Sequence, residues 1–318
     1  MKAFISGIAG TLGSSLAELL LNKGFKVKGN DIQRLEEAWK LKDVIGRIEY
    51  LWKSSWDLDV NDLKDVDVVF DCSIAFADRP MGSSSPAHVL IGNLMPPLRL
   101  LEVVRRLERK PVVVYASSFN SLYGHPPGTV FTEKTPPLPS NLYGATKACA
   151  ELIYQSYHKA YGIPIIITRV GSAFGPKGRI DELPHKLIYY CLKGRDFYLR
   201  SPQAKRLWTY SEDVLDFYSK LIERVDDFIG EVLHCAGNRG DEIVTNLELA
   251  NRIKRLTGSD IRIIEGEYEP GELVNGKPID FGIDSTYTRK RLGWNPKHSL
   301  NEGLRKTINW FRGWLGRA

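Results

Sequence analysis

Cysteines, long apolar runs and concentrated charge are all scarce in this sequence, and each scarcity excludes a class of protein. The four cysteines, Cys72, Cys149, Cys191 and Cys235, form no C-x-x-C pair, which excludes a zinc ribbon and a dithiol redox motif. No stretch approaches the roughly 18 consecutive apolar residues that a membrane-spanning helix needs. The N-terminus also lacks the charged and apolar segments of a signal peptide. We therefore expect reduced thiols and a cytoplasmic protein.

Metal-ligand spacing and a basic patch are also missing. The six histidines show no spacing typical of a metal site, so no metal is expected. The net charge is +6, but residues 1–170 carry 20 basic and 17 acidic side chains, and residues 171–318 carry 24 and 21. Because nucleic-acid binding proteins concentrate their positive charge in one patch or stripe, this even distribution argues against a nucleic-acid partner.

Short apolar runs alternate with helical patterns in the first half of the chain. Strands are expected at 3–6, 25–30, 48–52, 66–72, 111–117 and 164–169. These nearly continuous apolar runs are typical of parallel strands that helices cover on both faces. The pattern loosens after about residue 170. The fold class predicted is therefore α/β, with a doubly wound parallel sheet in residues 1–170 and a smaller C-terminal α/β lobe in 171–318.

Three glycines follow the first expected strand. Gly7, Gly10 and Gly13 stand where the chain enters its first helix. A turn without side chains lets the backbone approach a pyrophosphate, and the helix N-terminus offers free N–H groups to it. Asp31 ends the second strand, where a carboxylate can bind both hydroxyls of an adenosine ribose. This pattern predicts a dinucleotide site, and Asp31 favours NAD over NADP, although Arg34 lies nearby.

A tyrosine and a lysine share one face of an expected helix. Tyr143 and Lys147 form Y-x-x-x-K, and the spacing of four residues lets the phenol and the ammonium interact. Tyrosine has a pKa near 10, so using it as a base near neutrality requires a positive neighbour that stabilises the phenolate. Ser117 and Ser118 end the strand at 111–117, at the sheet edge where α/β enzymes place their sites. These residues predict proton transfer to and from a hydroxyl group.

In these motifs the sequence resembles the extended short-chain dehydrogenase/reductase family, in the NAD-dependent epimerase and dehydratase branch typified by UDP-glucose 4-epimerase. The resemblance covers essentially the whole chain and implies a Rossmann fold, with returns to the cofactor domain near 207–236 and 281–291. It implies Ser118, Tyr143 and Lys147 as catalytic residues. The cofactor contacts that it implies are Gly7, Gly10, Thr11, Leu12, Gly13, Asp31, Asp57, Leu58, Cys72, Ser73, Ile74, Asn93, Ala116, Tyr143, Lys147 and Val170.

The chain departs from the family pattern around the substrate. One extra residue before Gly124 would put Phe119 in the catalytic position, but we prefer Ser118, because strand register fixes the sheet edge while loops absorb insertions. The acid pair of 4,6-dehydratases is replaced by Phe119 and Asn120, which argues against a dehydratase. The substrate contacts that the resemblance implies are Ser118, Asn120, Ser172, Arg206, Lys277 and Asp280, with Arg206 the best phosphate ligand.

The expected function is an NAD-dependent nucleotide-sugar epimerase of the UDP-glucose/UDP-galactose 4-epimerase type, working through a 4-keto intermediate. Two alternatives remain at this point. One is an NAD-dependent dehydrogenase or reductase of another sugar or small hydroxylated substrate, and the other is a non-catalytic nucleotide-binding protein. Apolar helices around 94–107 and 152–161 favour a homodimer, as in relatives.

Overall fold

The computed structural model describes residues 1–74, 86–269 and 271–316. This part of the chain forms two compact units. Unit 1 comprises residues 1–121, 142–169 and 218–233, and unit 2 comprises 122–141, 170–217 and 234–318. Unit 1 therefore receives one late return, at 218–233, while residues 281–291 belong to unit 2.

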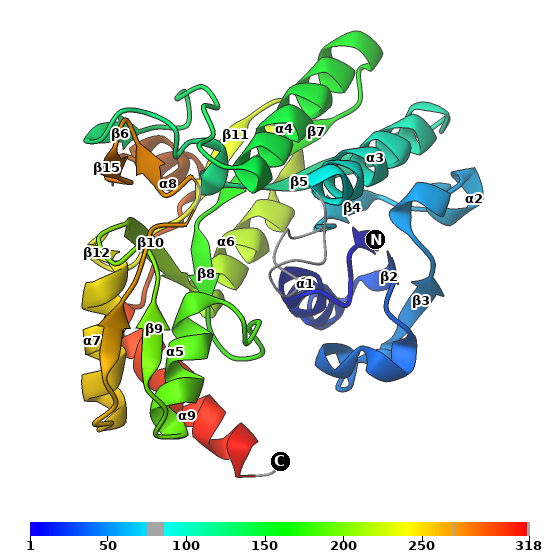
Figure 1. Cartoon of the computed structure of the whole chain (residues 1–318). Helices are drawn as coiled ribbons and strands as arrows, with labels where there is room; N and C mark the ends of the chain where they lie inside the picture. The colour runs from blue at the N-terminus through cyan, green and yellow to red at the C-terminus, as the bar shows by residue number, and fades with distance from the viewer. Residues whose placement is uncertain (75–85, 270, 317–318) are drawn as a thin grey trace. The chain divides into compact units, whose positions relative to one another are not determined.

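A seven-stranded sheet organises unit 1 (Figure 1). Its order is β11-β7-β5-β4-β1-β2-β3, and β3, β2, β1, β4 and β5 pair in parallel. Each of the six expected strands is present within two residues of its predicted ends. The strands are β1 (Lys2–Ser6), β2 (Lys26–Asp31), β3 (Ile48–Trp52), β4 (Val68–Asp71), β5 (Val112–Ser118), β7 (Ile165–Val170) and β11 (Val232–Cys235).

Helices cover both faces of this sheet, which explains the apolar strands. On one face, α3 (Pro86–Arg105) and α4 (Leu142–Tyr161) run side by side over a core that includes Phe4, Val69 and Val113 (Figure 1). Side chains alternate along a strand, so Phe70 points to the other face and meets Tyr218. The remaining helical segments of unit 1 are α1 (Thr11–Asn22), α2 (Val60–Leu63), the last part of α6 (Ser211–Glu223) and the 3₁₀ helices η1 (Leu35–Glu37), η2 (Trp39–Leu41), η3 (Ile45–Arg47), η4 (Ser55–Asp57), η5 (Phe119–Ser121) and η6 (Val225–Phe228).

The strand order reverses at β1, which is where an open α/β sheet binds its ligand. The chain leaves β1 toward β2 on one side, and β4 pairs with β1 on the other. In open α/β sheets the crossovers diverge at such a reversal, and ligands bind in the crevice outside the carboxyl ends of the strands there. Gly7 follows β1 and Cys72 follows β4, so the fold brings these predicted cofactor residues to one edge.

Unit 2 is built from short strands and amphipathic helices around its own core. Helices α7 and α9 each begin with a capping box, formed by Thr245 with Glu248 and by Ser299 with Glu302. Their buried faces pack with Leu187 and Trp208. The elements are β6 (Thr129–Phe131), β8 (Ser172–Phe174), α5 (Leu183–Leu192), β9 (Phe197–Leu199), β10 (Lys205–Tyr210), β12 (Ile243–Thr245), α7 (Asn246–Thr257), β13 (Ile263–Glu265), β14 (Leu273–Val274), β15 (Lys277–Pro278), β16 (Phe281–Ile283), α8 (Thr286–Leu292) and α9 (Leu300–Leu315).

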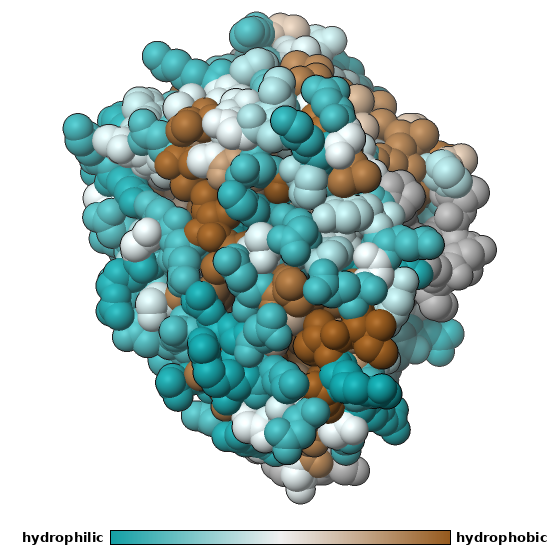
Figure 2. Space-filling model, turned by 60° about the vertical axis from the view of Figure 1, so that its left-hand side comes forward, coloured by the Kyte–Doolittle hydropathy of each residue, from teal (hydrophilic) through white to brown (hydrophobic). Residues whose placement is uncertain are grey.

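One face of the molecule is mainly polar. Hydrophilic residues predominate on the face drawn in Figure 2, and apolar residues form small groups among them. None of the helices in the described ranges combines the length and the apolar character needed to cross a membrane.

Candidate functional site

The glycine turn of unit 1 has the shape that a pyrophosphate site requires. Gly7 adopts φ +75°, and a Cβ on Gly13 would lie only 2.2 Å from the Gly7 carbonyl oxygen. Gly10 is the N-cap of α1, and the first turn of this helix carries no acidic side chain. The helix itself therefore places no carboxylate beside the N–H groups of Thr11 and Leu12, and this helix N-terminus suits a bound anion.

Asp31 closes the other side of this turn. Its Oδ2 accepts a hydrogen bond from the Ala9 N–H at 3.0 Å, and its Oδ1 accepts one from the Gln33 N–H at 3.1 Å. Because a carboxylate has four acceptor positions, two remain for ribose hydroxyls. The Arg34 guanidinium lies over the Trp52 ring, 4.9 Å from its centroid. The glycines and Asp31 thus fit a dinucleotide with free ribose hydroxyls.

Lys40 contacts the start of α1, and sequence reasoning did not predict this contact. It lies in η2, and its Nζ donates a hydrogen bond to Thr11 Oγ1 at 2.6 Å. Thr11 is the first residue of α1. An ammonium group therefore stands at the helix end that already attracts anions. Only the fold brings position 40 to position 11, so no local sequence signal could identify this contact.

The other predicted cofactor residues lie around the carboxyl edge of the sheet. A Cβ on Gly7 would lie 2.9 Å from the Cys72 carbonyl oxygen and 3.0 Å from Ser73 Cα, so the loop after β4 contacts the glycine turn. Asn93 on α3 is buried and donates to Thr146 Oγ1 at 3.1 Å. The remaining members are Asp57, exposed in η4, Leu58, buried after it, Ile74, exposed after β4, Ala116, buried in β5, and Val170, the last residue of β7.

Helix α4 carries the tyrosine and the lysine in its first two turns. Lys147 is buried, and its Nζ donates to the Ala116 carbonyl oxygen at 2.9 Å and lies 4.9 Å from the Tyr115 ring centroid. Burial lowers the pKa of the Lys147 ammonium, while nearby acidic groups oppose this shift. Tyr143 lies one turn earlier and is half-buried. This arrangement places a dry positive charge on the same helix face as the phenol.

The structure distinguishes the two candidate positions at the end of β5. Ser118 is the last residue of β5, and its Oγ accepts hydrogen bonds from the Asn120 N–H at 3.2 Å and from Asn120 Nδ2 at 3.3 Å. Phe119 is buried in η5. Phe119 is packed inside and its side chain carries no polar atom, whereas Ser118 presents a hydroxyl group at the strand end, as expected for the catalytic position.

Below Ser118 lies a buried ion pair that sequence reasoning also missed. Glu151, two turns after Tyr143 on α4, pairs with Arg169 at 2.9 Å, and both side chains are almost fully buried. Its Oε1 also accepts from Ser117 Oγ at 2.5 Å and from Ser121 Oγ at 3.2 Å. Since Ser117 and Ser121 flank Ser118, this network fixes the strand end and the loop that carry Ser118.

Two of the predicted substrate residues of unit 2, Arg206 and Ser172, contact the same tyrosine, Tyr123. Arg206 Nη2 pairs with Glu272 at 2.5 and 2.6 Å, and its guanidinium lies 5.0 Å from the Tyr123 ring centroid. Ser172 hydrogen-bonds Tyr123. This group therefore joins Ser172 and Arg206 around one buried tyrosine.

Lys277 and Asp280 lie apart from that group in their side-chain contacts. Asp280 pairs with Lys205 at 2.8 Å, and Lys277 is exposed on β15. Asn275 and Gly276, both at positive φ, make the tight turn that leads into β15. The expected lysine clamp is thus on an exposed hairpin.

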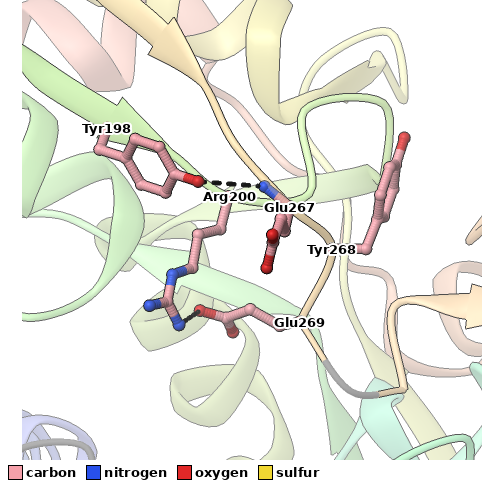
Figure 3. Close-up of a pocket in the computed structure, with 5 residues that line it drawn as sticks. All are labelled: Tyr198, Arg200, Glu267, Tyr268 and Glu269. Atoms are coloured by element: carbon pink, nitrogen blue, oxygen red, sulfur yellow. Dashed lines mark hydrogen bonds and ion pairs between the residues drawn. The ribbon is translucent and has the colours of Figure 1, made fainter.

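A cavity of about 320 Å³ opens in unit 2 (Figure 3). The Tyr198 hydroxyl accepts from the Glu267 N–H at 3.4 Å, and Arg200 pairs with Glu269 at 3.5 Å, as the dashed lines show. With Tyr268 these residues form the lining. The single arginine of the lining is matched by a carboxylate and a second carboxylate remains, so the cavity does not favour a diphosphate.

A known family matches nearly the whole chain. The family model described as GDP-mannose 4,6 dehydratase matches residues 4–307. The chain therefore belongs to this family, within the extended short-chain dehydrogenase/reductases, a group of NAD-dependent sugar epimerases and dehydratases. The doubly wound sheet with the glycine turn and the Y-x-x-x-K helix is consistent with this membership.

Individual relatives are distant but span the full length. The low-salt glycan biosynthesis protein Agl12 of Haloferax volcanii is 28% identical, covering 98% of this chain and 99% of its own. The UDP-glucuronate 4-epimerase of Thermodesulfobacterium geofontis is 25% identical over 96% of this chain and 94% of its own. A Bacillus cereus UDP-glucuronic acid 4-epimerase mutant, solved with a fluorinated UDP-sugar and NAD, has a TM-score of 0.87 and 25% identity, covering 99% of this chain and 100% of its own.

Proposed function

We propose that this protein is an NAD-dependent UDP-sugar 4-epimerase, of the UDP-glucose/UDP-galactose type. The observation that carries the proposal is the buried Lys147 ammonium, held against Ala116 on the same helix face as Tyr143. The two UDP-glucuronate 4-epimerases among the relatives support both the UDP-sugar and the reaction at carbon 4.

In this proposal Tyr143 and Ser118 act on one hydroxyl group. Tyr143 accepts the proton of the sugar 4-hydroxyl, and Ser118 hydrogen-bonds the same oxygen. The glycine turn and Asp31 would hold NAD, which when bound would supply the acceptor for the hydride of carbon 4 and the donor that returns it to carbon 4. The Lys147 ammonium stabilises the Tyr143 phenolate and binds the nicotinamide ribose. The 4-keto sugar then rotates in the site so that carbon 4 takes the hydride back on its opposite face, and Tyr143 returns the proton to the oxygen.

The loop after β5 supports epimerisation over dehydration. Loss of water from the neighbouring carbons requires an acid and a base beside the sugar. Residues 119–121 supply none, since Phe119 is packed and Asn120 bonds Ser118. The nearby carboxylate of Glu151 is committed to Arg169. The described loop after β5 and the helix beside it therefore offer no free carboxyl group for this chemistry.

A deuterium label at carbon 4 of UDP-glucose tests the proposal. Purified protein with catalytic NAD is expected to yield UDP-galactose that keeps the label at carbon 4, without accumulation of absorbance at 340 nm. UDP-glucuronate and dTDP-glucose serve as parallel substrates. NADH formed in proportion to product would contradict the proposal and indicate a dehydrogenase. Label found at carbon 6 of a deoxy sugar would contradict it and indicate a dehydratase.

We also propose a homodimer formed through α3 and α4. Leu90 and Ile91 on α3 and Leu152 and Tyr161 on α4 are exposed apolar side chains on adjacent helices. Sedimentation analysis should give a dimer, and Leu152→Asp should shift it toward monomer. A monomeric wild-type protein at micromolar concentration would contradict this part of the proposal.

A further inference from the structure

A buried carboxylate that the proposed mechanism does not use lies at the end of β4. Asp71 is 1% exposed. Its Oδ2 accepts a hydrogen bond from the Tyr154 hydroxyl at 2.6 Å, and its Oδ1 accepts bonds from the Ser73 N–H at 3.0 Å and the Ser73 hydroxyl at 2.6 Å. All of these donors are neutral, and no cation pairs directly with Asp71 among the described residues.

Lys147 on α4, which reaches the neighbouring strand β5, has the opposite imbalance: a buried positive charge with no carboxylate paired to it among the described residues. Asp71 is the register partner of Tyr115 on β5, and Lys147 Nζ bonds the carbonyl of the next residue, Ala116. The Tyr115 ring stacks on Tyr154 at 4.4 Å and also lies beside Lys147 Nζ. Lys147 is 4% exposed and forms no direct ion pair within the described ranges. A dry ammonium without a counter-charge would be strongly destabilising.

The acidic groups that face Lys147 come from three elements. They are Asp71 and the Cys72 thiol at the end of β4, Glu151 on α4, the Tyr143 phenol one turn earlier on α4 and the Tyr115 phenol on β5. Glu151 is already neutralised by Arg169. Burial raises the pKa of the Cys72 thiol and the pKa of the Tyr115 phenol, so both groups stay neutral. Among the described residues, Asp71 is therefore the carboxylate of this set that has no cationic partner of its own.

We propose that Asp71 is a positioning residue whose buried charge keeps the Lys147 ammonium protonated and so sets the alkaline limit of cofactor binding and turnover. The inference rests on the role of Lys147 in the proposed function. In agreement with the geometry, burial lowers the pKa of Lys147 and Asp71 is the largest opposing influence. Removal of the Asp71 charge leaves burial less opposed, so Lys147 should lose its proton at a lower pH.

The first test compares Asp71→Asn with Tyr154→Phe. The amide is close to isosteric but uncharged, whereas Tyr154→Phe removes a hydrogen bond to Asp71 and leaves its charge. The dissociation constant of NAD is measured by calorimetry across pH 6–10. In Asp71→Asn the alkaline loss of affinity should begin about one pH unit or more below wild type. In Tyr154→Phe it should stay within about 0.3 pH unit of wild type.

These outcomes separate the charge from a structural effect. Equal shifts in both variants, or no shift in Asp71→Asn, would overturn the proposal. Because NAD binding needs no sugar, the result stands even if the protein proves not to be an epimerase. With a substrate that the enzyme converts, the pH at which kcat falls on the alkaline side should shift by the same amount as the pH at which NAD affinity falls.

A double-mutant cycle on stability covers the case in which Asp71→Asn folds poorly. In the wild-type background Asp71→Asn should lower the Tm, because it strands the ammonium. In a Lys147→Met background the same change should raise the Tm, because it removes a stranded carboxylate. Additive effects of the two substitutions would overturn the proposal.

Discussion

The two units of this protein present their functional side chains in different ways. In unit 1 the predicted residues are placed by backbone features: a turn at positive φ, strand ends and the first turns of helices. In unit 2 the predicted substrate residues Arg206 and Asp280 are already paired, with Glu272 and Lys205. Positions that backbone features fix at the sheet edge can therefore be predicted from the sequence, while contacts between loop side chains cannot.

The largest expected effect is in unit 1. Tyr143→Phe removes the proton acceptor, so kcat should fall about 10³- to 10⁴-fold. The dissociation constant of NAD should change little, because the ring stays in place. Steady-state kinetics with calorimetric NAD titration measures both quantities. Turnover close to wild type would exclude Tyr143 as the proton acceptor. It would also remove the difference between unit 1, where the sequence predicts functional positions, and unit 2, where it does not.

The parts of unit 1 that local sequence predicts are those that follow from chain periodicity. Apolar runs predict β1, β4 and β5, because strands covered on both faces have no polar side, and the glycines predict the turn because a Cβ would collide there. Periodicity does not reveal the roles of Lys40, Asp71 and Glu151. Each of these side chains bonds a residue at least 18 positions away in the sequence, and a single charged residue carries no sign of that pairing.

The second effect tests whether the buried ion pair of Glu151 and Arg169 stabilises the end of β5, where Ser118 lies. Glu151→Gln leaves the Arg169 guanidinium buried beside a neutral amide, which should lower the free energy of unfolding by about 3 kcal/mol. Chemical denaturation followed by circular dichroism measures this change. As a control, Glu242→Gln disrupts an ion pair with Arg252 that is partly exposed, and it should cost less than about 1 kcal/mol.

Unit 2 could be predicted less well because its geometry depends on pairings between loops. Sequence order indicated Arg206 as a phosphate ligand, but not that Glu272, 66 positions later, forms two hydrogen bonds to it. Lys277 was expected as a clamp, and a turn at Asn275 and Gly276 leaves it exposed. Neither contact leaves a periodic or spacing signal in the chain.

The third effect falls on this half alone. If Arg206 binds a substrate diphosphate, Arg206→Ala should raise KM for the UDP-sugar about 10- to 100-fold, because a charge-assisted hydrogen bond is lost. The NAD dissociation constant should not change. Glu272→Gln, which frees the guanidinium, should lower KM or leave it unaltered. If KM is insensitive to both changes while both lower the Tm, the pair is structural, and the substrate anion must bind elsewhere.

The smallest effect is expected at Lys40 in unit 1, a residue that the sequence did not indicate as a contributor to cofactor binding. Lys40→Ala removes the ammonium from the N-terminal end of α1, so NAD and ADP-ribose should bind about tenfold more weakly, while adenosine, which lacks the pyrophosphate, should bind unchanged. Lys42→Ala, an exposed neighbour of equal charge, is the matched control and should leave all three affinities within a factor of about two. Raising the ionic strength should reduce the difference between wild type and Lys40→Ala, because salt screens a charge that is only partly buried. Equal weakening of adenosine would mean that Lys40 supports the fold of η2 and Thr11 and does not act on the anion itself.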